Sequence, residues 1–229
     1  NYACHPVMFP LERTVSTHFP GRVREAIRGE WGSELPVVYY QGFSGDTRPL
    51  YLAERRLPQS FRHLYRRVRF GPAWDRRGKG IQEWEVWSDS LGARVLQAIS
   101  GAQPIEVQSY RAERFLVNRR DFVKAQGQPL SFQALRLGSS FGLVAVSGEV
   151  VSDYAQRTRK QLSSKYSMLV GCADDTVGYI PTRKMMVQGG YEGGAFVENF
   201  DLVGLNPDLE KNTMAALQAV TEKVSKPSP

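Results

Sequence analysis

The sequence predicts an α/β fold: a mixed β-sheet flanked by helices, with the functional site on loops that follow the strands. Short apolar, β-favouring runs alternate along the chain with stretches whose apolar residues recur at helical spacing. Glycine-containing loops follow three of these runs, at the position where α/β folds place their sites. Because the 229 residues contain no internal repeat and no low-complexity linker, we expect residues 1–229 to form one domain.

The N-terminal part is expected to contain helices around a short strand. Residues 20–27 predict a short helix, and residues 37–40 form an apolar run that favours a strand. A longer amphipathic helix is predicted where large side chains recur at helical spacing: Trp84, Trp87, Leu91, Val95 and Ile99.

The rest of the chain is expected to supply most of the sheet. Residues 107–117 alternate charged and apolar positions, which indicates an exposed strand of the antiparallel kind. Residues 141–146 and 168–170 are compact apolar runs that predict buried strands, and a helix-compatible stretch ends at Leu162. A final helix begins after Asn206. Its apolar face carries Met214, Leu217, Val220 and Val224.

Composition indicates a folded, basic protein. The hydrophobic content of 41% and the charged content of 23% are ordinary for a soluble globular domain and argue against disorder. The formal net charge of +7 favours anionic surfaces without naming a partner. No apolar run is long enough to span a bilayer. The chain opens NYACHPVMF, with neither an initiator Met nor a signal core, so we expect it to be part of a longer protein.

The cysteines and histidines carry little signal by themselves. Cys4 and Cys172 have no zinc-finger spacing, and free, buried thiols are favoured over a single disulfide. His5, His18 and His63 show no close ligand spacing. Only His5 stands apart, because it lies in a loop-like segment among apolar residues.

Three loops that follow predicted buried strands combine into one candidate site. They are QGFSGDTRP, SGEVV and GCADDTVGYIPT. Their glycines permit sharp turns and a close approach of the backbone. Each loop alone is compatible with an ordinary tight turn. Their shared position at strand ends is what indicates a site.

Longer segments around these loops resemble a known enzyme family. NYACHPV, YYQGFSGDTRP, VSGEVVSDYAQRTRK and LVGCADDTVGYIPTRKMMVQGGYEGG occur in the order found in neutral/alkaline non-lysosomal ceramidases. The resemblance covers most of residues 1–50 and 84–225 and is weakest between Leu50 and Gln82. It implies that residues 1–229 are the C-terminal part of a single ceramidase-like catalytic domain, with a basic insertion at residues 50–82.

The resemblance also implies a zinc site. Its ligands on this chain would be His5, Glu149 and Tyr179. The fourth ligand in the family is a histidine in an HTHS-type segment, which this chain lacks, so a missing N-terminal part would supply it as a partner. Imidazole and carboxylate suit Zn²⁺, and a nearby cation favours the phenolate form of tyrosine. Zinc-activated water would then cleave an amide bond of a lipid-like, ceramide-like N-acyl substrate. By itself, the chain is expected to be inactive.

Two further residues are catalytic candidates by the same resemblance. Tyr191, in GGYEGG, corresponds to a substrate-facing tyrosine whose hydroxyl would donate to the developing oxyanion. The alternative is an aromatic side chain packed at a glycine turn. Asp46 would orient a ligand or fix its loop. The family usually has Ser or Asn where this chain has Arg48, which would alter the site if it pointed inward and would only pair with the loop if it pointed outward.

A basic segment offers a different function. Between Arg55 and Lys79, nine basic side chains are interleaved with aromatic residues. They could contact an anionic membrane surface or nucleic acid phosphates, or pair with nearby carboxylates as a solvated insertion. No nucleic-acid module signature accompanies them, which argues against nucleic acid. The alternative to the enzyme is therefore a non-catalytic binding module that uses this segment.

Overall fold

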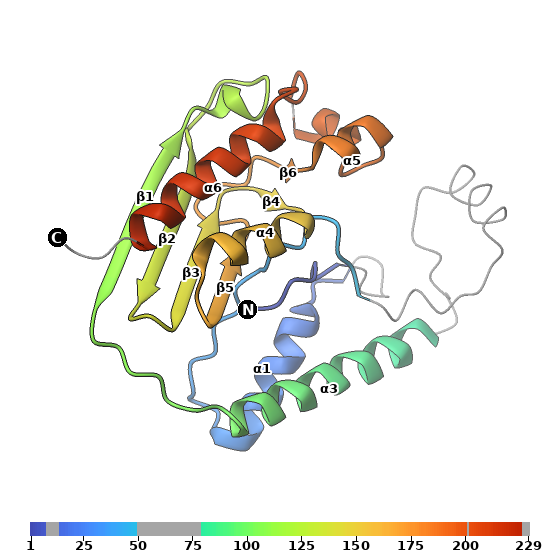
Figure 1. The fold of residues 1–229 in the computed structure, drawn as a ribbon. Coiled ribbons are helices and arrows are strands. Elements are labelled where there is room, and N and C mark those ends of the chain that lie inside the picture. Colours follow the sequence, from blue (N-terminus) through green and yellow to red (C-terminus); the bar gives the residue numbers. More distant parts are fainter. Residues whose placement is uncertain (8–13, 50–78, 201, 226–229) are drawn as a thin grey trace. The chain divides into compact units, whose positions relative to one another are not determined.

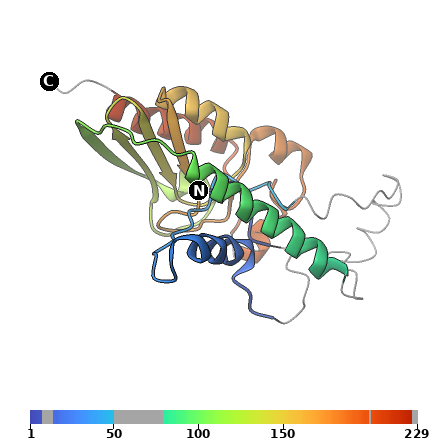
Figure 2. The ribbon, with the colours of Figure 1, turned by 90° about the horizontal axis from the view of Figure 1, so that it is seen from below.

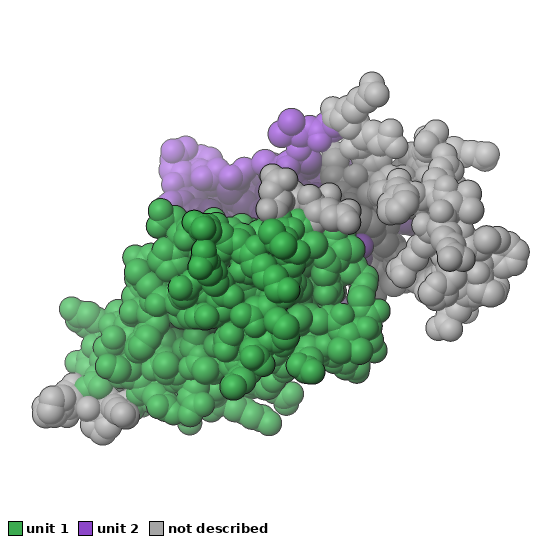
Figure 3. All heavy atoms as spheres, turned by 90° about the horizontal axis from the view of Figure 1, so that it is seen from above, with its two compact units in different colours: residues 1–5, 39–47, 104–229 green, residues 6–38, 48–103 purple. Residues whose placement is uncertain are grey.

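The chain divides into two compact units, which Figure 3 colours separately. The computed structural model describes residues 1–7, 14–49, 79–200 and 202–225. Unit 1 consists of residues 1–5, 39–47 and 104–229, and unit 2 of residues 6–38 and 48–103. All five candidate residues, His5, Asp46, Glu149, Tyr179 and Tyr191, belong to unit 1. The basic segment, apart from Lys79, lies outside the described residues.

Unit 2 contains two helices that pack on each other. Helix α1 spans His18–Trp31 and helix α3 spans Lys79–Ser100, so both predicted N-terminal helices are confirmed. The ring of Phe19 in α1 meets the ring of Trp87 in α3 edge to face, with centroids 5.4 Å apart. No helix in the described part of the chain is long and apolar enough to cross a membrane.

Unit 1 is built on a four-stranded mixed sheet (Figure 1). Its strands are β1 (Tyr110–Val117), β2 (Leu130–Leu137), β3 (Phe141–Val146) and β5 (Tyr166–Val170), in the spatial order β1-β2-β3-β5. The first two pairings are antiparallel, and β3 pairs with β5 in parallel. This confirms the predicted strand at residues 141–146 with its bounds, and the predicted alternation in β1, whose residues are exposed and half-buried in turn.

Two helices cover one face of this sheet and make the fold α/β, as predicted. Helix α4 spans Asp153–Leu162 and helix α6 spans Leu209–Ser225. Figure 2 shows both on the same side of the sheet. Their apolar faces pack on alternate strand residues because side chains alternate between the two faces of a sheet. The centre of this core includes Phe132, Val144, Leu169, Leu217 and Val220.

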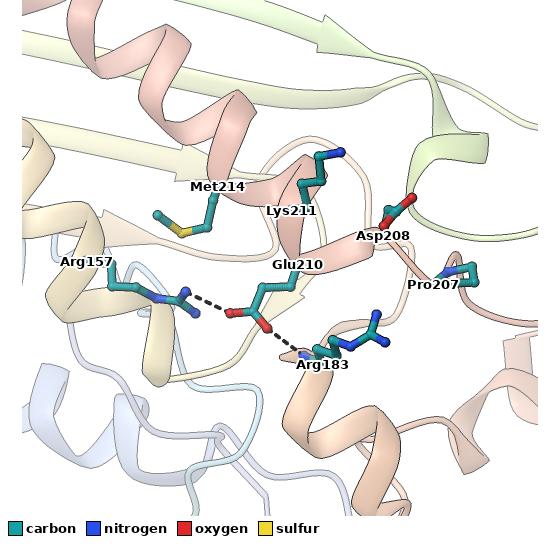
Figure 4. Close-up of a pocket in the computed structure, with 7 residues that line it drawn as sticks. All are labelled: Arg157, Arg183, Pro207, Asp208, Glu210, Lys211 and Met214. Carbon is teal, nitrogen blue, oxygen red and sulfur yellow. Dashed lines mark hydrogen bonds and ion pairs between the residues drawn. The ribbon is translucent and has the colours of Figure 1, made fainter.

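A carboxylate ties three helices of unit 1 together (Figure 4). Glu210, in the first turn of α6, accepts a hydrogen bond at 2.7 Å from Arg157 of α4. Its other oxygen accepts one at 2.7 Å from the backbone N–H of Arg183, where helix α5 (Arg183–Gln188) begins. Beside this junction lies an open cavity of about 310 Å³, lined in part by Lys211 and Met214.

A second sheet has two strands, one that leads into α4 and one that leads into α5. Strands β4 (Glu149–Val150) and β6 (Tyr179–Ile180) are parallel. Two 3-10 helices, η2 (Arg119–Asp121) and η3 (Ala195–Phe200), complete the described elements of unit 1.

The strand predicted at residues 37–40 is not present. The backbone of that segment is irregular. The bridge nearest to it pairs Tyr2 with Gln41, the residue that follows the segment. Val38 and Tyr40 are 67% and 47% exposed, so the apolar run is not a buried one. The boundary between the two units falls within it, which explains why it joins neither core.

Candidate metal centre and active site

His5 is oriented by the backbone around it. Residues 1–5 run beside residues 39–47, and the backbone N–H of His5 donates to the carbonyl oxygen of Thr47 at 3.0 Å. The ring atom Nδ1 lies 2.6 Å from the carbonyl oxygen of Ser44. Because a carbonyl oxygen only accepts hydrogen bonds, Nδ1 carries a proton and donates it. Nε2 is thereby turned to the opposite side, which is how proteins orient a histidine for metal binding.

The other nitrogen of His5 faces a carboxylate. Nε2 lies 2.5 Å from Oε2 of Glu149. A neutral imidazole nitrogen and an ionised carboxylate oxygen are both electron-pair donors, so at this distance a shared proton lies between them. Burial lowers the pKa of His5, but the hydrogen bond and charge of Glu149, together with nearby carbonyl oxygens, outweigh it and raise the pKa above its ordinary value. The pair is suited to holding a cation.

Glu149 and Tyr179 are brought together by strand register. In the parallel pair of β4 and β6, Glu149 lies directly opposite Tyr179. Directly opposed residues share a face of a sheet, so carboxylate and phenol meet. Burial, followed by the negative charge of the neighbouring Glu149, raises the pKa of this tyrosine. The phenol therefore stays protonated unless a cation takes the place of that proton.

A glycine with left-handed backbone precedes each of these two residues. Gly148 has φ +88° and Gly178 has φ +89°. Both conformations are strained for other residue types. At Gly178 a Cβ would also lie 2.6 Å from the ring of Phe196, and that ring packs on Tyr179 with centroids 5.1 Å apart. The glycines thus allow the sharp turns that deliver Glu149 and Tyr179 to one place.

Tyr191 lies next to this group. Its ring meets that of Tyr179 edge to face, with centroids 5.6 Å apart, and the residue is 40% exposed. The turn around it uses left-handed glycines on its N-terminal side, Gly189 and Gly190. Tyr191 therefore combines the packing role with access to solvent, and both sequence interpretations remain compatible with its position.

Asp46 anchors a loop. Its carboxylate oxygens accept hydrogen bonds from the backbone N–H of Ser152 at 2.7 Å and from the hydroxyl of Ser152 at 3.0 Å. This holds the turn that contains Ser44 against the start of α4. At Gly45, in the same turn, a Cβ would lie 2.5 Å from the carbonyl oxygen of Glu149, so only glycine permits this approach. Arg48 is exposed and belongs to unit 2.

The two cysteines are free, and they lie near a common tyrosine. Cys4 is buried, as predicted, whereas Cys172 is exposed, which corrects the prediction for that residue. The sulfur of Cys172 is nevertheless shielded enough that burial, with a smaller contribution from the charge of Glu149, raises its thiol pKa to about 11. Burial also raises the pKa of the Cys4 thiol to about 11. Both thiols act on the pKa of Tyr39.

Sequence reasoning proposed His5, Glu149 and Tyr179 as ligands but not the residues that orient and pack against them. The carbonyl of Ser44 orients His5, yet a backbone oxygen leaves no residue-type signal. Tyr39 donates to the carbonyl of Cys4 at 3.1 Å and to Gln41 at 2.8 Å, and its place at the end of an apolar run was the available clue. Phe196 packs beneath Tyr179 from a segment 17 positions later, which nothing in the sequence indicates.

The types of donor atom fit a zinc ion, but the described residues supply too few ligands for a complete site. Imidazole nitrogen, carboxylate and phenol oxygen converge from three separate segments, and these are atoms that Zn²⁺ accepts. Within the described residues, no group of three or more His, Cys, Asp and Glu side chains gathers as a metal site. The set of His5, Glu149 and Tyr179 contains only two residues of those types.

Comparison with solved structures shows where this fold occurs. No protein-family model and no curated protein matches the chain. The fold is similar to that of neutral ceramidase from Pseudomonas aeruginosa, with a TM-score of 0.63 and 12% identity over 95% of this chain and 42% of that one. It is also similar to a structure described as ceramidase complexed with C2, with a TM-score of 0.64 and 10% identity over 95% and 44% of the two chains.

These similarities confirm the ceramidase resemblance at the level of the fold. They extend over nearly the whole chain, although the chain spans less than half the length of either solved structure. At identities of 10–12% they carry the fold alone. The functional argument therefore rests on the side chains of the candidate site.

Proposed function

We propose that this chain forms part of a zinc-dependent hydrolase that cleaves the amide bond of a lipid-like N-acyl substrate. The observation that carries the proposal is the convergence of His5, Glu149 and Tyr179. Nε2 of His5 and Oε2 of Glu149 lie 2.5 Å apart, and Tyr179 lies directly opposite Glu149 in the pairing of β4 with β6. At this separation the two atoms share a proton, and a zinc ion that replaced the proton would move them further apart. The ceramidase fold supports the substrate class, an amide-linked lipid.

Each residue has a definite task in this proposal. Ser44 holds Nδ1 of His5, so that Nε2 faces the site. Glu149 supplies the negative charge, and Tyr179 completes the set on this chain. Bound there, zinc would supply Lewis-acid activation of a water molecule. The hydroxyl of Tyr191, beside Tyr179 and partly exposed, would donate a hydrogen bond to the oxygen of the substrate carbonyl as negative charge develops on it. Asp46 is a positioning residue, because its carboxylate is engaged by Ser152.

The proposal requires polypeptide beyond these residues. Structural or catalytic zinc sites in proteins use three or four protein ligands, and a histidine from an N-terminal segment would complete the set given by His5, Glu149 and Tyr179. An anionic membrane surface would be a natural source of a lipid-like substrate for a chain of net charge +7.

Metal content tests the ligand set directly. The complete gene product that contains these residues should carry about one zinc ion per molecule by elemental analysis. Glu149→Gln and Tyr179→Phe should lose most of it, because each removes a donor while nearly preserving side-chain shape. Two matched controls, Glu222→Gln and Tyr110→Phe, alter exposed residues outside the site and should keep the metal. Full zinc retention in Glu149→Gln would refute the assignment.

The same proteins separate the enzyme from the alternative function. Hydrolysis of N-acyl lipid amides should fall with the zinc content of the variants. A non-catalytic module that uses the Arg55–Lys79 segment would instead bind anionic vesicles or nucleic acid with strong salt dependence, unaffected by Glu149→Gln. That outcome, with no hydrolysis by the zinc-loaded protein, would favour the binding module.

A further inference from the structure

The side chain of Gln41 joins the two segments that hold His5. Its amide nitrogen Nε2 donates to the carbonyl oxygen of Cys4 at 3.0 Å and to the hydroxyl oxygen of Ser44. Cys4 immediately precedes His5, and the backbone carbonyl of Ser44 accepts a hydrogen bond from the ring of His5. One side-chain amide therefore contacts both the segment that carries His5 and the turn that orients its ring.

The orientation of this amide is fixed by its neighbours. The carbonyl oxygen of Cys4 can only accept a hydrogen bond, so Nε2 of Gln41 faces it rather than Oε1. Oε1 lies 2.8 Å from the hydroxyl of Tyr39, which donates to it. Burial raises the pKa of Tyr39, so this hydroxyl keeps its proton and remains a donor at neutral pH. Turning the amide over would bring two acceptors together at Cys4.

The backbone of Gln41 is anchored independently of its side chain. Its carbonyl oxygen accepts a hydrogen bond at 3.0 Å from the N–H of Gly171, the residue that follows β5. On its other side Gln41 pairs with Tyr2 in a parallel bridge. The residue thus lies between the N-terminal segment and the four-stranded sheet of unit 1. Because its backbone is fixed, its side chain can hold the groups that it contacts in place.

The turn that Gln41 contacts is the one that orients His5. The carbonyl oxygen of Ser44 accepts from Nδ1 of His5 at 2.6 Å and from the backbone N–H of Thr47 at 2.8 Å, which uses both of its lone pairs. The carbonyl oxygen of Thr47 accepts in turn from the backbone N–H of His5 at 3.0 Å. Ser44 is buried, and its hydroxyl also donates to the carbonyl of Gly42 at 3.2 Å. A shift of this turn would therefore move the ring and the backbone of His5 together.

We infer that Gln41 is a positioning residue, which acts through Cys4 and Ser44 to hold His5 with its Nε2 directed toward Glu149. The consequence for metal binding rests on the proposed function, which makes His5 a ligand. The hold on His5 itself does not, because it consists of hydrogen bonds within the protein. Residues that orient a metal-binding histidine contribute about 10- to 100-fold to metal affinity. Gln41 acts one contact further out, so its effect should lie near the lower end of this range.

Zinc affinity of the complete gene product tests this role. Gln41→Met keeps the length of the side chain and removes the amide, and it should lower zinc affinity by roughly tenfold in a chelator competition. Gln156→Met, at an exposed position on α4, is the matched control and should bind zinc as the wild type does. Equal zinc affinity in Gln41→Met and the wild type would overturn the inference.

A double-mutant cycle shows whether Gln41 acts through Ser44. Ser44→Ala removes the hydroxyl that accepts from Nε2 of Gln41 but keeps the backbone carbonyl that holds His5. If the two side chains act as one unit, Ser44→Ala should reduce zinc affinity much less in the Gln41→Met background than in the wild type. Fully additive losses would show that Gln41 does not act through this contact.

Hydrogen exchange of the metal-free protein distinguishes positioning from a general contribution to stability. In Gln41→Met, peptides that cover residues 2–5 and 42–47 should exchange their amide hydrogens several-fold faster, because the hydrogen bonds between these segments open more often. Peptides that cover α6 should exchange as in the wild type, since the contacts of Gln41 named above do not involve that helix. Equally faster exchange in α6 would mean a general loss of stability and would overturn the positioning role.

The two readouts also separate this inference from the proposed function. A wild type that holds no zinc, with faster exchange confined to residues 2–5 and 42–47 in Gln41→Met, would refute the proposed function and support the hold on His5. A wild type that holds zinc, with neither the affinity nor the exchange changed in Gln41→Met, would refute only the role of Gln41.

Discussion

At the scale of single residues, hydrogen bonds within the protein fix the orientation of His5 and Asp46 in the candidate site. His5 cannot present Nδ1 to a ligand, because that atom donates to the carbonyl of Ser44 at 2.6 Å. Its Nε2 is therefore committed to the side of Glu149. Asp46 is similarly engaged, since both of its oxygens accept hydrogen bonds from Ser152. Tyr191 differs from them, because it packs on Tyr179 yet remains 40% exposed.

Tyr191→Phe should separate substrate activation from metal binding. The phenyl ring preserves the edge-to-face contact with Tyr179, so zinc content should not change. Loss of the hydroxyl should reduce kcat by about 100-fold, the usual effect of removing one hydrogen-bond donor to an oxyanion. The measurement is steady-state hydrolysis of an N-acyl amide together with zinc analysis. A packed aromatic without a catalytic role would show unchanged kcat.

At the scale of elements, the site is assembled where short segments meet. The turn at residues 44–47 lies against β4, and this contact sets the distance between the Ser44 carbonyl and His5. The backbone N–H of Gly45 donates to the carbonyl of Val150 at 2.8 Å. The two backbones are so close that the site tolerates no side chain at Gly45.

Gly45→Ala should therefore weaken metal binding without touching a ligand. Its Cβ would lie 2.5 Å from the carbonyl oxygen of Glu149, so the turn must move away from β4. Overpacking of this kind costs about 1–3 kcal/mol, and zinc affinity should fall with it. Gly29→Ala is the matched control, because nothing lies within 4 Å of a Cβ there and alanine favours the helix. Equal zinc affinity in both variants, by chelator competition, would contradict this role of the turn.

Sequence patterns predict long elements well and short ones poorly, and the site shows why. Helix α3 has 22 residues, and its apolar period from Trp84 to Ile99 predicted it, while the apolar run of β3 was found with its bounds. Strands β4 and β6 have two residues each, too few for any periodicity, so the register that pairs Glu149 with Tyr179 was beyond reach. The same limit explains the error at residues 37–40, where apolar composition alone suggested a strand.

Strand β2 was missed although its signal is present. Leu130, Phe132 and Ala134 alternate as a buried face should, but polar residues between them mask the run. The three ligand candidates came from the family resemblance of the segments that contain them. Their convergence is a property of the fold, because His5 and Glu149 are 144 positions apart.

At the scale of the whole of unit 1, the carboxylate of Glu210 joins helices α4, α5 and α6 (Figure 4). Arg157 reaches this carboxylate from α4 while its guanidinium also lies over the ring of Tyr154, 4.9 Å from the centroid. Burial of Glu210 raises its pKa, but the hydrogen bond from the Arg183 backbone and the pairing with Arg157 outweigh it, so the pKa lies below its ordinary value.

The stability of unit 1 should consequently depend on acid pH through Glu210. A carboxyl whose pKa is lower in the folded state than in the unfolded chain contributes stability above its unfolded pKa and loses it as the pH falls through the folded pKa. Glu210→Gln should reduce the free energy of unfolding by roughly 1–2 kcal/mol near neutral pH, and the difference from the wild type should shrink as the pH falls below about 4.5. Urea unfolding near neutral pH and below about pH 4.5 measures this difference in the free energy of unfolding.

Glu222→Gln is the matched control. Among the hydrogen bonds of the described residues, the Glu222 carboxylate accepts one from Gln218 on the exposed side of α6, so the substitution should change the free energy of unfolding little at either pH. A destabilisation of Glu210→Gln that stayed constant across this range would mean that the carboxylate charge does not hold the three helices together.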